Sequence, residues 1–150
     1  MKTIRKIELK WSRVSLVRDE CNVEYGAQIR HSSDTINIIN ALIGDEVHEV
    51  VIALQLNTKN RVVGYSEVSR GGMAGSAVTP ADVFRPALIA GASKIIVAHN
   101  HPSGEPRPST EDVVFTKRLR EAGELLGVQV LDHIIVGDGS YFSFVDEGVF

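Results

Sequence analysis

The chain has 150 residues, of which 43% are hydrophobic and 23% are charged, and its formal net charge is −3. This length fits one domain, which can bury roughly 70% of the surface that the unfolded chain exposes. No apolar run approaches the roughly 20 residues that span a bilayer, and the basic start of the chain lacks the apolar segment of a signal peptide. The single cysteine, Cys21, excludes an intrachain disulfide. We therefore expect a cytoplasmic protein without membrane contact, in which residues 1–150 form a single domain.

Charge is distributed unevenly along the chain. Residues 1–30 hold seven basic and four acidic side chains, a surplus of three positive charges, so the rest of the chain carries a formal charge of −6. Nucleic-acid-binding proteins usually show a basic domain or stripe, so this balance predicts weak nucleic-acid binding at most. The basic N-terminal segment either contacts phosphate or an acidic partner, or forms the solvated face of an edge strand.

The first half of the chain predicts mainly strands. "TIRKIELKW" alternates as a strand does, and "RVSLV" is a second candidate. "SSDTINIINALIG" predicts a helix, because Ser and Asp can cap its start, isoleucines recur at helical spacing and a glycine ends it. "HEVVIALQLNTKNRVVGYSEV" predicts two strands around a turn at residues 57–60. The Gly-rich segment "SRGGMAGSAV" predicts a mobile loop, and whether residues 70–76 gate a site stays open.

The second half mixes helices and strands. "TPADVFRPALIAGA" predicts a helix that Pro86 kinks or interrupts, and "SKIIVAHNH" predicts a strand. "STEDVVFTKRLREAGELLG" predicts an amphipathic helix with Val114, Leu119, Leu125 and Leu126 on its apolar face. "VQVLDHIIVGDGSYFSF" predicts a hairpin that turns at residues 137–139. Because strands and helices do not alternate strictly, we expect an α/β fold with a mixed β-sheet flanked by helices, and not a doubly wound dinucleotide-binding fold.

Two histidines stand at the end of the predicted strand in "VAHNHPSGEPRPSTED". Residues i and i+2 of a strand share a face, so His99 and His101 present neighbouring imidazoles, as at the start of many zinc sites. Asp112, in the first turn of a helix capped by Ser109, is the leading candidate for a third ligand. The alternative is a polar strand end followed by an ordinary helix start, because Ser109 and Asp112 also fit a capping box. A site with two His and one Asp keeps one position open for water, and hydrolysis would also need a carboxylate as proton shuttle.

The spacing of these residues resembles the JAMM motif of MPN-domain metalloproteases, H-x-H-x7-S-x2-D. "PADVFRPALIAGASKIIVAHNHPSG" and "VLDHIIVGDGSYFSF" resemble the bacterial RadC branch of that superfamily. The resemblance runs from about residue 46 to the C-terminus, which implies a JAMM/MPN core at 46–150, with a cytidine-deaminase-like fold, joined to N-terminal strands and a helix at 1–45. The RadC family usually carries a helix-hairpin-helix region before this domain. Residues 1–45 do not resemble one, which weakens a role on DNA.

The resemblance implies a role for each motif residue. His99, His101 and Asp112 correspond to the zinc ligands, and Ser109 to the serine that stabilises the oxyanion. The motif glutamate corresponds to Glu49. Glu46 and Glu67 are alternatives for that glutamate.

Two further polar residues near the motif are expected to be structural. Ser103 is expected to hold a turn, and His133, on an apolar strand, to be a core residue or a neighbour of a ligand. The function implied is a Zn²⁺-dependent hydrolase that cleaves a peptide or isopeptide bond in a peptide or protein substrate. The alternatives are a non-catalytic metal-containing binding module and a DNA-repair-associated RadC-type protein.

Overall fold

The computed structural model describes residues 26–71 and 77–150, so Cys21, the two strands expected near the N-terminus and the centre of the Gly-rich segment lie outside the described residues. The elements are α1 (Ser32–Ile43), β1 (Val50–Leu56), β2 (Val62–Arg70), α2 (Pro80–Ile89), β3 (Lys94–Asn100), α3 (Thr110–Leu126), β4 (Gln129–Val136) and β5 (Tyr141–Ser143). The strands form one sheet in the order β2-β1-β3-β4-β5, in which β3 and β4 are parallel and the other pairs antiparallel. This confirms the α/β class and the mixed sheet. No helix in the described ranges is long and apolar enough to cross a membrane.

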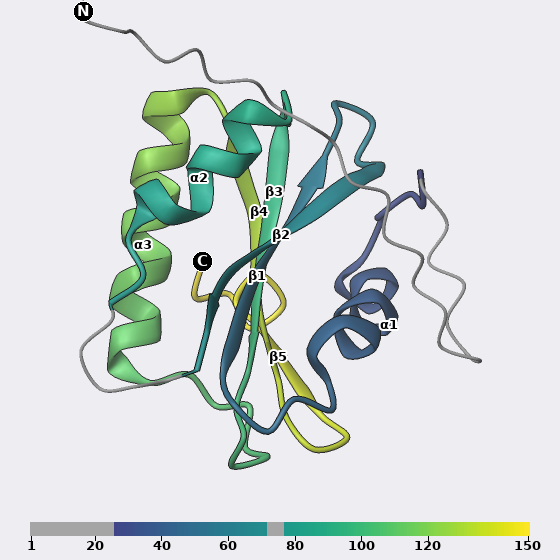
Figure 1. The fold of residues 1–150 in the computed structure, drawn as a ribbon, viewed down its shortest axis with the longest axis vertical. Coiled ribbons are helices and arrows are strands. Elements are labelled where there is room, and N and C mark those ends of the chain that lie inside the picture. The colour runs from purple at the N-terminus through teal and green to yellow at the C-terminus, as the bar shows by residue number, and fades with distance from the viewer. Residues whose placement is uncertain (1–25, 72–76) are drawn as a thin grey trace, which may run out of the picture.

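The sheet lies between two layers of helix, with α2 and α3 on one face and α1 on the other (Figure 1). Every residue of β1 is buried, because β1 is an inner strand with both faces covered. Its side chains alternate between two cores: Ile52 and Leu54 pack with α1, whereas Val51 and Ala53 pack with α2 and α3. Side chains of the sheet that point towards α3 can therefore meet residues of that helix.

Both predicted hairpins and the helix at α1 are present. β1 and β2 pair around a turn in which the amide of Asn60 donates to the carbonyl of Asn57. β4 and β5 pair around Gly137–Gly139. The cap of α1 differs in detail, because His31 is the N-cap residue and the Asp34 carboxylate accepts the backbone N–H groups of Arg30 and His31.

Pro86 was predicted to kink or interrupt its helix, and the interruption does not occur. α2 continues from Pro80 to Ile89 with Pro86 inside it. Pro86 has no N–H for the carbonyl four residues earlier, so the helix loses one hydrogen bond. The loss is tolerated because α2 ends three residues later and Val83, Phe84 and Ala87 anchor it in the core on both sides of the proline.

The apolar face predicted for α3 is largely wrong. Of its four residues only Leu119 is buried, whereas Val114, Leu125 and Leu126 are 55%, 90% and 46% exposed. The buried face consists of Thr116, Leu119 and Gly123 instead. At Gly123 a Cβ atom would lie 2.5 Å from the carbonyl oxygen of Val128, so the helix packs closely through small and polar residues.

The parallel pairing of β3 and β4 determines where α3 begins. A parallel pair needs a crossover connection, and α3 supplies it between β3 and β4. The chain leaves the C-terminal end of β3, passes through the loop 101–109 and enters α3 next to that strand end (Figure 1). The two histidines and the first turn of α3 are thereby brought to the same end of the sheet.

Candidate metal centre

His99 and His101 converge at the end of β3. His99 lies in the strand and is 3% exposed, and His101 follows directly after it. Their Nε2 atoms lie 3.0 Å apart, and their rings are 4.9 Å apart between centroids. The prediction that the two imidazoles lie side by side is confirmed.

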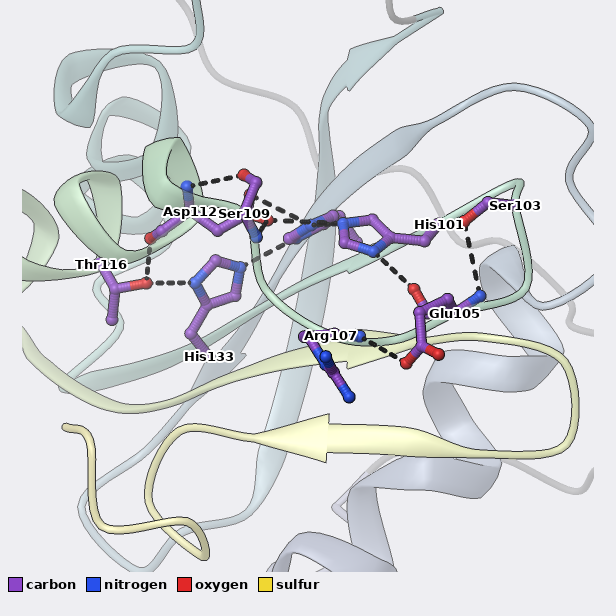
Figure 2. Close-up of polar contacts among 9 residues, drawn as sticks. His101, Ser103, Glu105, Arg107, Ser109, Asp112, Thr116 and His133 are labelled. Atoms are coloured by element: carbon purple, nitrogen blue, oxygen red, sulfur yellow. Dashed lines mark hydrogen bonds and ion pairs between the residues drawn. The ribbon is translucent and has the colours of Figure 1, made fainter.

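Asp112 both caps the helix and faces the histidines. Its Oδ2 accepts the backbone N–H of Ser109 at 2.8 Å, while the Ser109 hydroxyl oxygen accepts the backbone N–H of Asp112 at 3.1 Å. Asp112 Oδ2 lies 3.4 Å from His101 Nε2 (Figure 2). Its Oδ1 lies 3.3 Å from His99 Nε2. The two interpretations of the sequence, a capping box and a His-His-Asp group, are therefore both correct.

These three side chains form a group that can hold a metal ion. Their nitrogen and oxygen atoms all lie within 4.8 Å of one another, and no fourth His, Cys, Asp or Glu joins the group in the described ranges. Zinc lies about 2.0–2.2 Å from such ligands, which in a tetrahedral site puts the ligand atoms roughly 3.3 Å from each other. The separations of 3.0, 3.3 and 3.4 Å fit that geometry. The side chains of His101 and Asp112 are 16% and 18% exposed, so the site reaches the surface.

The surroundings of Asp112 favour the ionised form that a metal ligand needs. Burial acts to raise the pKa of Asp112, but the contact with His99 and the hydrogen bonds from Ser109 outweigh it, so the pKa lies below its ordinary value and the carboxylate stays ionised. Burial, together with the neighbouring His99, holds the pKa of His133 well below its usual range. Metal ligands bind as ionised carboxylates and neutral imidazoles.

The loop after His101 is fixed by the β4–β5 turn. His101 Nδ1 donates to the carbonyl of Glu105 at 2.8 Å, which leaves Nε2 of a neutral ring for a metal (Figure 2). The amide of Asp138 donates to the carbonyl of Gly104 at 2.9 Å, and Gly137 packs so closely that a Cβ there would lie 2.2 Å from that oxygen. Ser103 accepts the amide of Glu105 at 3.4 Å, in agreement with its expected place in a turn.

The three candidate glutamates differ in their partners. Arg70 bonds Glu46 at 2.7 Å and Glu67 at 2.9 Å, and its hydrogen bond lowers the pKa of Glu67. Glu49 is half-buried just before β1, and its carboxylate has no hydrogen bond or ion pair to any residue in the described part of the chain. Val51 and His99 form the last pair of the ladder between β1 and β3, and Glu49 lies two residues before Val51, close to this end of the ladder.

Asn100 is a residue of the site that the sequence interpretation missed. It is buried, its Oδ1 accepts the amide of Val50 at 2.7 Å, and its Nδ2 donates to the carbonyls of Glu46 and His48 at 3.1 and 3.0 Å. Where β3 diverges from the segment before β1, the side-chain amide of Asn100 thus makes the hydrogen bonds to the backbone that a neighbouring strand would otherwise make. Asn100 thereby fixes the backbone on both sides of Glu49.

His133 and Thr116 lie behind the ligands. His133 is fully buried, with Nε2 2.9 Å from His99 Nδ1 and Nδ1 2.6 Å from the Thr116 hydroxyl. The expectation that His133 is buried in the core is confirmed, and His133 contacts His99, a candidate ligand. Thr116 was missed, although its position four residues after Asp112 puts it on the same face of α3.

Comparisons with known proteins agree with this architecture. The profile described as RadC-like JAB domain matches residues 29–149, so the match begins before the expected residue 46 and includes α1. A UPF0758 protein of Carboxydothermus hydrogenoformans is 46% identical over 78% of this chain and 52% of its own length. A UPF0758 protein of Trichlorobacter lovleyi is 51% identical over 70% of this chain and 46% of its own length.

A UPF0758 protein of Staphylococcus haemolyticus is 46% identical over 82% of this chain and 54% of its own length. The chain thus spans about half the length of the curated relatives that it matches. The profile match covers most of the described residues, including both histidines, Asp112 and the hairpin that supports their loop. The chain therefore belongs to the RadC-like JAB domain family.

Proposed function

We propose that the protein is a zinc-dependent hydrolase of the JAMM type that cleaves a peptide or isopeptide bond in a peptide or protein substrate. The observation that carries this proposal is the convergence of His99, His101 and Asp112 at the spacing of zinc ligands, at the surface end of β3. Structural zinc sites are usually closed by four protein ligands, whereas catalytic sites have three and an open position. A group of three side chains that reaches the surface therefore supports a catalytic zinc site.

Each side chain then has a defined task. Zinc at such a site supplies Lewis acidity, which polarises a carbonyl and lowers the pKa of water. His99, His101 and Asp112 hold the ion. Glu49 takes a proton from the attacking water and passes it to the leaving amine, a role worth roughly 10²–10⁴ in rate. The Ser109 hydroxyl hydrogen is free to donate to the developing oxyanion, because its oxygen serves the helix cap as acceptor only.

The choice of Glu49 is supported by the partners of its rivals. A general base needs a carboxylate that is free to accept a proton, and Arg70 engages both Glu46 and Glu67. Glu49 has no such partner among the described residues, and the backbone around it is held by Asn100. Its position two residues before Val51, which pairs with His99, also supports this choice.

The test is turnover on a library of peptides and isopeptide-linked conjugates, with zinc content and melting temperature measured on the same preparations. Glu49→Gln is expected to keep zinc and stability while turnover falls by at least about 10²-fold. Glu67→Gln, which changes a carboxylate engaged by Arg70, is the matched control and should retain turnover. Full turnover in Glu49→Gln would remove Glu49 as the shuttle. No turnover in the wild-type protein would favour a non-catalytic metal-binding module.

A further inference from the structure

A buried chain of hydrogen bonds links α3 to the metal centre. It runs from the backbone carbonyl of Asp112 to the Thr116 hydroxyl, at 2.7 Å, and from Thr116 to His133 Nδ1, at 2.6 Å (Figure 2). His133 Nε2 then lies 2.9 Å from His99 Nδ1. Thr116 and His133 are 2% and 0% exposed. The chain thus begins at a fixed backbone oxygen and ends on the ring of a metal ligand.

The direction of every proton in this chain follows from its first member. A carbonyl oxygen only accepts, so the single hydroxyl hydrogen of Thr116 points at Asp112. The contact between Thr116 and His133 must then be donated by Nδ1–H of His133. If Thr116 instead donated its hydroxyl hydrogen to His133, the Thr116 oxygen and the Asp112 carbonyl oxygen would lie 2.7 Å apart with no hydrogen between them.

The ring of His133 is in an environment that suits its neutral form. It stacks on Phe144 at 5.0 Å between centroids and meets the edge of Phe115 at 6.3 Å. Its two nitrogens contact a hydroxyl and an imidazole, and neither contacts a carboxylate. A buried imidazolium without a counter-charge would be costly. With its proton on Nδ1, a neutral His133 offers a lone pair on Nε2, which accepts Nδ1–H of His99.

We infer that Thr116 and His133 are positioning residues that fix the tautomer of His99, with the proton on Nδ1 and the lone pair on Nε2. That lone pair faces His101 Nε2 and Asp112 Oδ1, where the ion proposed above would bind. The reverse tautomer would put a hydrogen atom where the ion belongs. The metal-affinity part of this inference rests on the proposed metal site, whereas the proton on Nδ1 of His99 can be measured in the metal-free protein.

Three variants of buried threonines test the inference. Thr116→Val replaces the hydroxyl by a methyl group of similar size, whereas Thr116→Ser keeps the hydroxyl. Thr35→Val is the matched control, because Thr35 is fully buried in α1 and its hydroxyl has no hydrogen-bond partner among the described residues. The measurements are the ¹⁵N NMR signals of the histidine rings in the metal-free protein, the zinc affinity by chelator competition, and the melting temperature.

The expected result is a His99 ring protonated at Nδ1 in wild type, Thr116→Ser and Thr35→Val, and a different or mixed tautomer in Thr116→Val. Zinc affinity should fall by about 10–100-fold in Thr116→Val only, the usual cost of losing a partner behind a metal ligand. A His99 ring that lacks a proton on Nδ1 in the wild-type protein would overturn the inference. So would equal zinc affinities in Thr116→Val and Thr35→Val.

The two proposals can fail separately. If Thr116→Val does not fold, the tautomer of wild-type His99 and the zinc affinity of Thr116→Ser still decide the inference. If the wild-type protein binds no zinc or cleaves no peptide, the proposed function fails, while the ring signals of the metal-free protein still test the tautomer.

Discussion

Gly137→Ala probes the contact between the β4–β5 turn and the loop that carries His101. The new Cβ would lie 2.2 Å from the carbonyl oxygen of Gly104 and 2.9 Å from Cδ of Pro106, and the oxygen belongs to the backbone. Optimal contacts are about 3.5 Å or longer, so the loop must move by roughly 1 Å. Overpacking of this kind costs about 1–3 kcal/mol, which lowers the melting temperature of a domain of this size by about 2–12 °C.

The displacement should also reach the metal. The carbonyl of Glu105, one residue beyond Gly104, accepts Nδ1–H of His101 and orients its ring. We therefore expect zinc affinity, measured by chelator competition, to fall by about 10–100-fold in Gly137→Ala. Gly139→Ala is the control: Gly139 has φ +67° with no atom near a new Cβ, so the change should cost about 1–2 kcal/mol of stability and leave zinc affinity unchanged. Wild-type zinc affinity and melting temperature in Gly137→Ala would refute this reasoning.

Three further outcomes are expected. Ser109→Ala should lower the free energy of unfolding, measured in denaturant, by about 0.5–2 kcal/mol because the helix cap is lost. The same variant should show reduced turnover, and unchanged turnover would exclude Ser109 from catalysis. Burial lowers the pKa of His133 below the ordinary histidine value of about 6.5. At a pH below that value, the unfolded chain therefore binds more protons than the folded protein. The melting temperature of the metal-free protein should therefore fall as pH decreases from about 7 to 5, and a constant or rising value would contradict the neutral ring. Random duplex DNA should bind no tighter than about 10⁻⁴–10⁻⁶ M at physiological salt, so nanomolar binding by titration would revive a role on DNA.

The positions of the candidate ligands were predictable from the sequence because they depend on local geometry. The spacing of His99 and His101 along one strand, and of Ser109 and Asp112 across one helical turn, follows from the repeats of those elements. Both hairpins were predictable for the same reason, since their turn residues lie between apolar strands.

The residues that support the ligands were not predictable, because their roles depend on pairings between distant segments. In the sequence Thr116 is an ordinary helix residue. Its contact with His133 exists only because the crossover packs α3 against β4. In the sequence Asn100 is only the last residue of a strand. Its hydrogen bond to Val50 depends on the pairing of β1 with β3. The apolar face predicted for α3 was wrong for a related reason: α3 packs closely at Gly123, and Leu125 and Leu126 are left exposed.

The central claim is that His99, His101 and Asp112 hold a zinc ion. It is tested most directly by elemental analysis of protein purified without chelator, comparing the wild type with a folded His101→Ala variant. We expect about one zinc ion per chain in the wild type and almost none in the variant, because a catalytic site has only three protein ligands to lose. Undiminished zinc in His101→Ala, or a wild-type protein that binds no metal even when zinc is supplied, would contradict the account.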